Sequence, residues 1–316
     1  LNYMTLPRGT TTQSNRGRAV FGGGYTGGPS PAGAATATMS YAQIQSEGNT
    51  IDFGDLTQAR WIPAAYGSST RGIWNGGATP TRLNTIDYVT IATTSNATEF
   101  GDLTAPRTYH DSCSNSTRGI SGGGNDGGTN TNVLDYITIA SVGNATDFGD
   151  LTVARSQIVS TSSPTRGLFM GGSPSAPTAV NTVDYVTIAT TGNATDFGDM
   201  TAPTEYGGGF SSNVRAVYGG GYSPGSPSYS NKIEYFTIAS TGNGTDFGDL
   251  IDSQITHSGG TSNSIRGLWG GGFSPGNNNS IEYVIIATTG NAKDFGDITS
   301  ATRGVAATSD SHGGLS

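Results

Sequence analysis

Apolar and polar residues alternate along this chain in a pattern that returns with a period of roughly 50 residues. In the unit 155–203, residues 183–189 read Val-Asp-Tyr-Val-Thr-Ile-Ala, a β-branched alternation that predicts a strand. Segments 156–162, 166–170 and 195–200 are shorter candidates for strands, separated by Gly, Pro, Ser and Asn turn residues. Each unit therefore predicts four antiparallel strands and almost no helix.

The same unit occurs six times, and each copy ends in Phe-Gly-Asp. The units are 8–59, 60–106, 107–154, 155–203, 204–252 and 253–302, with terminal stubs 1–7 and 303–316. Four strands per unit at this period predict an all-β, six-bladed β-propeller that forms a single domain over 1–316. The second stub aligns with a first strand. Because six units already complete the ring, we interpret both stubs as tethers.

Composition limits the partners of the chain. The net charge is −8, and Lys232 and Lys293 are the two lysines, which argues against binding to nucleic acid or anionic membranes. No apolar run approaches the ~20 residues of a membrane span, so we expect no membrane insertion. Cys113 is the single cysteine, so no intrachain disulfide forms. The chain begins at Leu1 rather than Met, and we interpret it as processed or part of a longer product.

The unit resembles a kelch repeat over essentially the whole chain. The features that carry the resemblance are the arginine before the first strand (Arg107), the Gly123-Gly124 pair, Tyr136 of the third strand and the tail 103–107. The chain departs from the kelch pattern at Phe148, where a Trp is usual. The motif Thr-Gly-Asn-Ala-Thr-Asp-Phe-Gly-Asp resembles the repeats of kelch-like proteins of marine tailed phages, especially cyanophages. That resemblance implies a virion structural or adhesion protein.

The positions at which the repeats differ are the candidates for binding. They follow the glycine pairs, in loops rich in Gly, Ser, Pro, Asn and Tyr, the composition of adaptable binding loops. We predict a ligand-binding face there, formed by Tyr25, Asn125, Asp126, Tyr222 and Phe273. The alternative is that these loops are merely exposed.

The positions that recur predict structural pairing. An arginine begins each second strand, and a carboxylate precedes every Phe-Gly pair at the same edge of the blade. We predict that they form ion pairs, since arginine can bind a carboxylate through two hydrogen bonds. The residues are Arg18, Arg71, Arg118, Arg166, Arg215, Arg266, Asp147, Asp196, Asp246 and Asp294.

We predict no catalytic residues, metal or cofactor. Calcium bound by pairs such as Asp196 and Asp199 is one alternative, because oxygen-rich turns can hold this ion. Copper chemistry at Tyr109, His110 and Cys113 is another, and the remaining histidines lie in other units.

The sequence thus favours a non-enzymatic virion protein on the surface of a marine phage particle. Its partners would be other virion proteins and a host-surface glycan or receptor. A free carbohydrate-binding lectin and a propeller-scaffold enzyme, an oxidase or lyase, are the alternatives.

Overall fold

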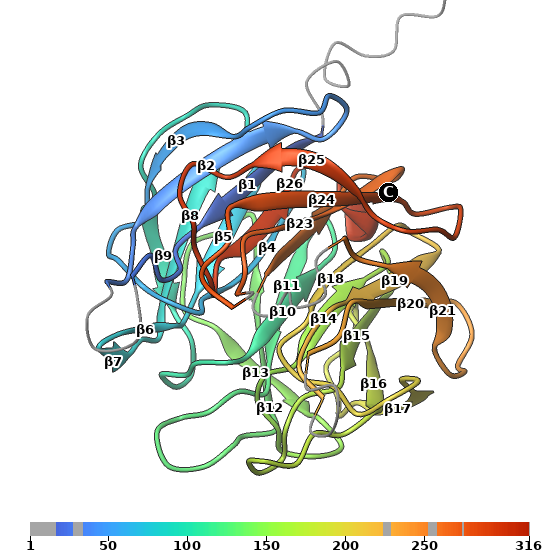
Figure 1. Ribbon diagram of the computed structural model, residues 1–316. Coiled ribbons are helices and arrows are strands. Elements are labelled where there is room, and N and C mark those ends of the chain that lie inside the picture. Colours follow the sequence, from blue (N-terminus) through green and yellow to red (C-terminus); the bar gives the residue numbers. More distant parts are fainter. Residues whose placement is uncertain (1–16, 28–33, 224–228, 252–257, 274, 316) are drawn as a thin grey trace, which may run out of the picture.

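The computed structural model describes residues 17–27, 34–223, 229–251, 258–273 and 275–315. In this part of the chain, six antiparallel four-stranded sheets are arranged as the blades of a propeller (Figure 1). The predicted fold class is therefore confirmed. We number the blades in chain order and describe the strands of each from the axis outward.

Blade 1 contains β26 (Ala306–Ser309), β1 (Arg18–Gly22), β2 (Thr38–Gln43) and β3 (Ile51–Asp55). Blade 2 contains β4 (Ala64–Gly67), β5 (Arg71–Asn75), β8 (Thr85–Thr90) and β9 (Thr98–Asp102). The small hairpin of β6 (Ala78–Thr79) and β7 (Thr81–Arg82) lies in its middle loop. Blade 3 contains β10 (Asp111–Ser114), β11 (Arg118–Gly122), β12 (Val133–Thr138) and β13 (Thr146–Asp150).

Blade 4 contains β14 (Val159–Ser162), β15 (Arg166–Met170), β16 (Thr182–Thr187) and β17 (Thr195–Asp199). Blade 5 contains β18 (Gly208–Ser211), β19 (Arg215–Gly219), β20 (Lys232–Thr237) and β21 (Thr245–Asp249). Blade 6 contains β22 (Gly259–Ser262), β23 (Arg266–Gly270), β24 (Ser280–Ile285) and β25 (Lys293–Asp297). The short 3-10 helix η1 (Gly313–Leu315) follows β26. All four strands predicted for the unit 155–203 are present in blade 4.

The last strand of the chain completes the first blade. β26 pairs antiparallel with β1, with Ala307 opposite Phe21 and Ser309 opposite Ala19. The alignment of this segment with a first strand is confirmed, but its interpretation as a spare tether is wrong. Blade 1 has no other inner strand among the described residues, so 306–309 belongs to the ring. The other proposed tether lies outside the described residues.

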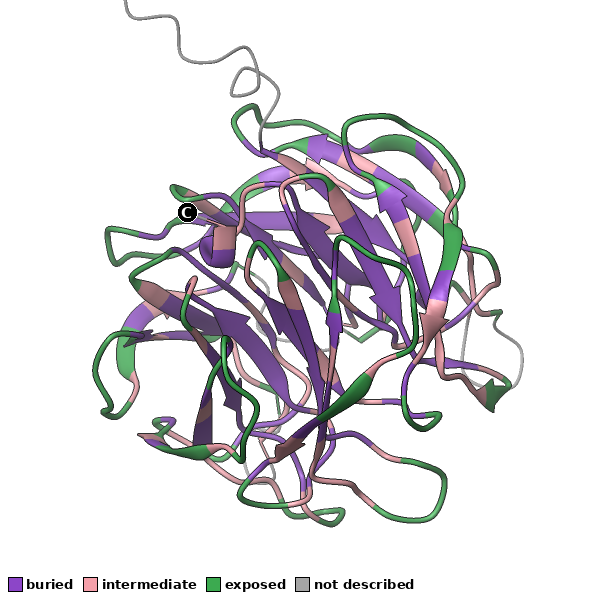
Figure 2. Ribbon diagram, turned by 180° about the vertical axis from the view of Figure 1, so that it is seen from behind, coloured by how far each residue is buried: buried purple, intermediate pink, exposed green. Residues whose placement is uncertain are grey.

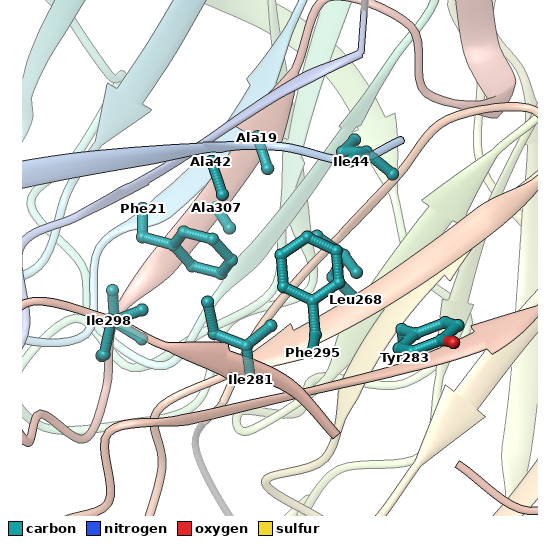
Figure 3. Packing of buried hydrophobic residues seen from close by; sticks show 11 residues of the cluster. Ala19, Phe21, Ala42, Ile44, Leu268, Ile281, Tyr283, Phe295, Ile298 and Ala307 are labelled. Atoms are coloured by element: carbon teal, nitrogen blue, oxygen red, sulfur yellow. The ribbon is translucent and has the colours of Figure 1, made fainter. Parts of the chain in front are cut away.

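The core of the molecule lies between the blades. Each of the six junctions holds one cluster of buried apolar side chains, and burial follows the inner strands of the ring (Figure 2). At the junction of blades 6 and 1, Phe295 and Ile281 face Phe21 and Ala307 (Figure 3). Burying one such Phe contributes roughly 1.5–3 kcal/mol. The Phe of Phe-Gly-Asp therefore packs between blades.

The glycine after that Phe lets two blades approach closely. At Gly101, φ is +153°, and an added Cβ would lie 2.4 Å from the carbonyl oxygen of Gly143 in the next blade. Only glycine fits this approach. The amide of Gly143 donates to the Phe100 carbonyl at 2.9 Å, and the Asn144 side chain accepts from the Asp102 amide at 3.1 Å. We call this contact the rim latch.

The rim latch recurs at every junction, with the turn asparagine of one blade bonded to the last Asp of the preceding blade. The asparagines are Asn49, Asn96, Asn144, Asn193, Asn243 and Asn291. The repeated Thr-Gly-Asn and Phe-Gly-Asp motifs are therefore the two sides of one contact between blades.

The predicted arginine–carboxylate pairing is wrong. In the described part of the chain no ion pair joins Arg166 to Asp196, and Asp196 is exposed. Instead the Arg166 guanidinium lies 4.7 Å from the ring centroid of Tyr185 and donates to the Ile238 carbonyl of the next blade at 3.0 Å. The arginine and the carboxylate do lie at the same edge of the blade, as predicted. However, the tyrosine ring and the carbonyl are closer to the guanidinium than the exposed carboxylates are.

The other arginines of this set behave alike, each over the tyrosine of its own blade. They are Arg18, Arg71, Arg118, Arg215 and Arg266. The corresponding carboxylates Asp147, Asp246 and Asp294 are likewise exposed. These arginines therefore hold adjacent blades together, though not through ion pairs with the predicted partners.

Buried ion pairs occur elsewhere, where sequence reasoning did not place them. Arg60 pairs with Asp87 at 2.7 Å, and Arg155 with Asp184 at 3.0 Å, with all four side chains fully buried. Arg107 and Asp135 form the equivalent pair. Each arginine comes from the segment that enters a blade, and each aspartate precedes the tyrosine of that blade's third strand. The pairs fix the entry segments that carry the residues described next.

Candidate functional site

One face of the propeller carries both the segments that enter each blade and the loops between its second and third strands. The register places them together, because the start of β4 at Ala64 lies opposite the end of β5 at Asn75. We call this side the crossover face. The opposite side, the turn face, carries the hairpin turns between the first and second and between the third and fourth strands. The predicted binding residues all belong to the crossover face.

Tyr25 and Phe273 are brought together by the closure of the ring. Tyr25 forms an antiparallel bridge with Arg303, the residue that leads into β26. The Arg303 guanidinium lies 4.9 Å from the ring centroid of Tyr25 and 5.1 Å from that of Phe273. Two of the predicted residues thus flank a cation that sequence reasoning did not select.

The other predicted residues lie in different blades. Asn125 in blade 3 accepts hydrogen bonds from Arg82 at its backbone carbonyl (3.1 Å) and its side chain (2.7 Å). Asp126 beside it is exposed and accepts from the amides of its own loop, which holds the pKa of its carboxyl below the usual value. Tyr222 in blade 5 packs edge-on against Tyr229, with ring centroids 5.5 Å apart. The predicted set is therefore distributed over the face rather than gathered in one pocket.

Sequence reasoning missed the residues at the centre of this face. In the entry segments of blades 2 to 5, one residue near the axis adopts a left-handed conformation: φ is +50° at Ile62, +57° at Tyr109, +61° at Gln157 and +66° at Tyr206. Such values are uncommon outside glycine and costly for a β-branched residue. The repeat alignment gives no sign of them, because the blades carry different residue types there.

These residues interlock around the mouth of the axial channel. The amide of Gln157 donates to the Tyr109 carbonyl at 2.7 Å, and that of Tyr206 to the Gln157 carbonyl at 3.1 Å. The rings of Tyr109 and Tyr206 meet edge to face at 5.9 Å, and Trp61 contacts Tyr109 in the same manner. The outcome is an aromatic surface at the centre of the crossover face.

Beneath this surface lies a polar axial cavity of about 130 Å³. Its lining includes hydroxyl groups that are buried and have no hydrogen-bond partner among the described residues, such as those of Thr161, Thr261 and Thr308. A polar cavity of this size holds several water molecules or one small molecule, since an engineered cavity of roughly 150 Å³ admits benzene.

Asp111 is the carboxylate that lines the cavity. It accepts from the amides of Ser112 at 2.8 Å and Ser160 at 2.6 Å, and burial raises the pKa of its carboxyl to about 7. His110, its neighbour, turns to the other side of the strand and bonds Asn75 at 2.7 Å. Burial, reinforced by Arg107, holds the pKa of the His110 imidazole well below its usual value.

The copper alternative finds no common centre at this strand. His110 faces blade 2, whereas Cys113 packs in the cluster shared with blade 4. Burial raises the pKa of the Cys113 thiol. His257 lies outside the described residues. Among those described, no group of three or more His, Cys, Asp or Glu side chains gathers as metal ligands would.

The channel is occupied at the turn face by the end of the chain. Serines at the ends of the inner strands donate to the carbonyl of the preceding blade at 2.5–2.7 Å; they are Ser114, Ser162, Ser211, Ser262 and Ser309. Blade 2 has Gly67 at this position, and His312 Nε2 lies 2.9 Å from its carbonyl oxygen. Burial lowers the pKa of the His312 imidazole to about 4, so it is neutral above that pH.

Comparison with known proteins does not assign the chain to a family. No protein-family model matches the chain, and no curated protein is significantly similar to it. None of the described helices is long and apolar enough to span a membrane. The class defined here is a six-bladed β-propeller with four antiparallel strands per blade.

Proposed function

We propose that this chain is a non-enzymatic adhesion component of a marine tailed-phage virion. It binds a host-surface glycan or a partner protein through the crossover face. The resemblance of the repeat sequences to those of kelch-like phage proteins supports the assignment to a virion. The binding role is supported by one observation above all, the collection of aromatic side chains on a single face. Tyr, Trp and Arg dominate interface hot spots, and aromatic faces stack on sugar rings.

The two faces differ in what they offer to a partner. The turn face repeats nearly the same hairpins at every blade, and these are used by the rim latch. The crossover face carries Tyr25, Trp61, Tyr109 and Phe273 in loops of different length and composition. Variation on a rigid scaffold is typical of a recognition surface.

Substituting Tyr25, Tyr222 and Phe273 together by Ser tests the binding face. We expect attachment to host cells and to a glycan array to fall at least roughly tenfold, because hot-spot side chains contribute about 2 kcal/mol or more each. The matched control replaces exposed apolar residues of the turn face, Val142, Val214 and Ile265, by Ser. Binding that survives the first set and falls with the second would place the site on the other face.

The virion setting is tested separately by searching purified particles for the protein with an antibody. Particles without it would remove the virion assignment and leave a free lectin as the alternative.

A further inference from the structure

Arg303 is held on the crossover face in a way that leaves its hydrogen-bonding edge available. Its backbone is fixed by two bonds with Tyr25, from the Tyr25 amide at 2.8 Å and to the Tyr25 carbonyl at 3.2 Å. Its guanidinium carbon lies over both aromatic rings, 4.9 Å from the ring centroid of Tyr25 and 5.1 Å from that of Phe273. Among the described residues, no carboxylate forms an ion pair with it, and no acceptor is recorded for its N–H groups.

This arrangement contrasts with the other arginines of the molecule. Arg60, Arg107 and Arg155 are buried against aspartates, and those of the second strands donate to a carbonyl of the next blade. Arg303 is half-buried, and its two ring contacts restrict its rotamers. A preorganised guanidinium fork loses little entropy when it binds a planar anion such as a carboxylate.

A second arginine lies on the same side of the channel mouth. Arg82 donates from Nε and one terminal nitrogen to Asn125, and its other terminal nitrogen donates to no acceptor in the described part of the chain. Burial raises the pKa of the Tyr109 phenol, and the positive charges of Arg82 and Arg303 act against that rise. The backbone links both arginines to the segment 61–62: Ala78, the strand partner of Arg82, forms a bridge with Trp61, and the carbonyl of Gly304, which follows Arg303, accepts from the Ile62 amide at 3.0 Å.

Two carboxylates lie near this sector, and hydrogen bonds from its own loop lower the pKa of the Asp126 carboxyl more than the charge of Arg82 does. Asp126 is exposed and held by its own loop, and Glu205 belongs to blade 5, where burial raises the pKa of its carboxyl. On a chain with a net charge of −8, two arginines among aromatic rings form a local positive site. Positive charge beside sugar-stacking faces is the chemistry that recognises an acidic saccharide.

We propose that Arg303, with Tyr25, Phe273 and the neighbouring Arg82, binds the carboxylate of an acidic sugar, so that the ligand of the crossover face is a uronate-type glycan rather than a neutral one. This inference rests on the proposed glycan-binding function and specifies its ligand class. Arg303 forms the charged contact, and the two rings that hold it supply apolar surface for the sugar ring.

The test compares oligogalacturonate with its methyl-esterified form, which keeps the sugar backbone and removes the charge. Calorimetry on the full chain should show tighter binding of the acid form, weakening as salt rises because the contact is electrostatic. Arg303→Gln should lower affinity for the acid form roughly ten- to hundredfold, the size of a charge-assisted hydrogen bond, with the ester unaffected. Arg303→Lys should fall between, since it keeps the charge and loses the fork.

The control is Arg166→Gln, which removes a stacked arginine from the turn-face end of a blade and should leave both affinities unchanged. Equal binding of acid and ester overturns the inference while the proposed glycan function stands. An unchanged affinity of Arg303→Gln for the acid form also overturns it. Failure to bind either oligosaccharide overturns it too, and the glycan array then decides the broader function independently.

Discussion

Apart from Arg82, which donates to a neighbouring loop, the described arginines occupy three kinds of position, and their immediate neighbours decide their role. Facing a buried aspartate, as Arg60 faces Asp87, an arginine forms an ion pair that would leave an uncompensated charge if one partner were removed. Over a tyrosine at a strand edge, it reaches a carbonyl of the next blade. Beside two aromatic rings, as at position 303, it forms no ion pair with a described carboxylate. Residue type alone does not distinguish these cases.

Asp111 provides a prediction at the same scale. Its folded pKa of about 7 lies above the unfolded value of roughly 3.9, so protonation favours the folded state. The contribution is fully present below about pH 4 and is lost as the pH rises to 7, by an amount on the order of a few kcal/mol. The free energy of unfolding, from urea titrations, should therefore fall between pH 5 and pH 8 more steeply in the wild type than in Asp111→Asn.

The asparagine also removes one acceptor for a backbone amide, so the absolute stability of this variant is not informative and the slope is the quantity to compare. Equal slopes in the two proteins would show that the Asp111 carboxyl titrates near its ordinary value. An NMR titration of the carboxyl carbon gives the same answer directly.

At the scale of the blade, strand order and register follow from the repeat, whereas the contacts between blades do not. The four strands of 155–203 could be predicted because alternation and turn residues are local signals. At five junctions the rim latch joins an asparagine to an aspartate more than 40 residues earlier in the chain, and at ring closure it joins Asn49 to Asp297. Alignment shows only that both residues recur. One feature of the sequence could have predicted the pairs Arg107–Asp135 and Arg155–Asp184. The units that carry Glu234 or Glu282 in place of the aspartate also lack an arginine at the entry position.

The rim latch predicts that alanine substitutions at two glycines, Gly149 and Gly128, change the free energy of unfolding by different amounts. At Gly149, φ is +144°, and an added Cβ would lie 2.5 Å from the Gly192 carbonyl group of the next blade. Gly149→Ala should therefore lower the free energy of unfolding by about 2 kcal/mol. Gly128→Ala is the matched control, because nothing lies within 4 Å of its added Cβ. Similar losses in both variants, measured by chemical denaturation, would argue against the close approach.

At the scale of the whole molecule, closure determines which surfaces exist. β26 brings Arg303 beside Tyr25 and carries η1 into the channel, so the candidate binding site and the plugged channel depend on one segment. Sequence analysis identified the strand and misjudged its place, because counting repeats from the first residue treats the last segment as surplus. The left-handed residues at the channel mouth could not be predicted from the sequence either, because their conformation is imposed by the ring rather than by neighbouring residues in the chain.

Ring closure by β26 gives the last prediction. A chain ending at Arg303 leaves β1 as an unpaired inner edge and exposes the apolar sides of blades 6 and 2, which Ala306 and Ala307 cover in the intact protein. We expect this truncation to lose the single cooperative melting transition and to aggregate, because an open edge strand pairs with other chains. A chain ending at Ser311 keeps β26 and the Asp310 contact to the Gly17 amide at 2.7 Å. It lacks η1 and the His312 contact to the Gly67 carbonyl, and should melt cooperatively at a moderately lower temperature. Adding a synthetic peptide of residues 304–316 to the first truncation should restore the transition in proportion to peptide concentration, since a partner that binds only the folded state stabilises it by mass action. A truncation at Arg303 that melts like the intact chain without the peptide would show that the first blade needs no strand from the end of the sequence.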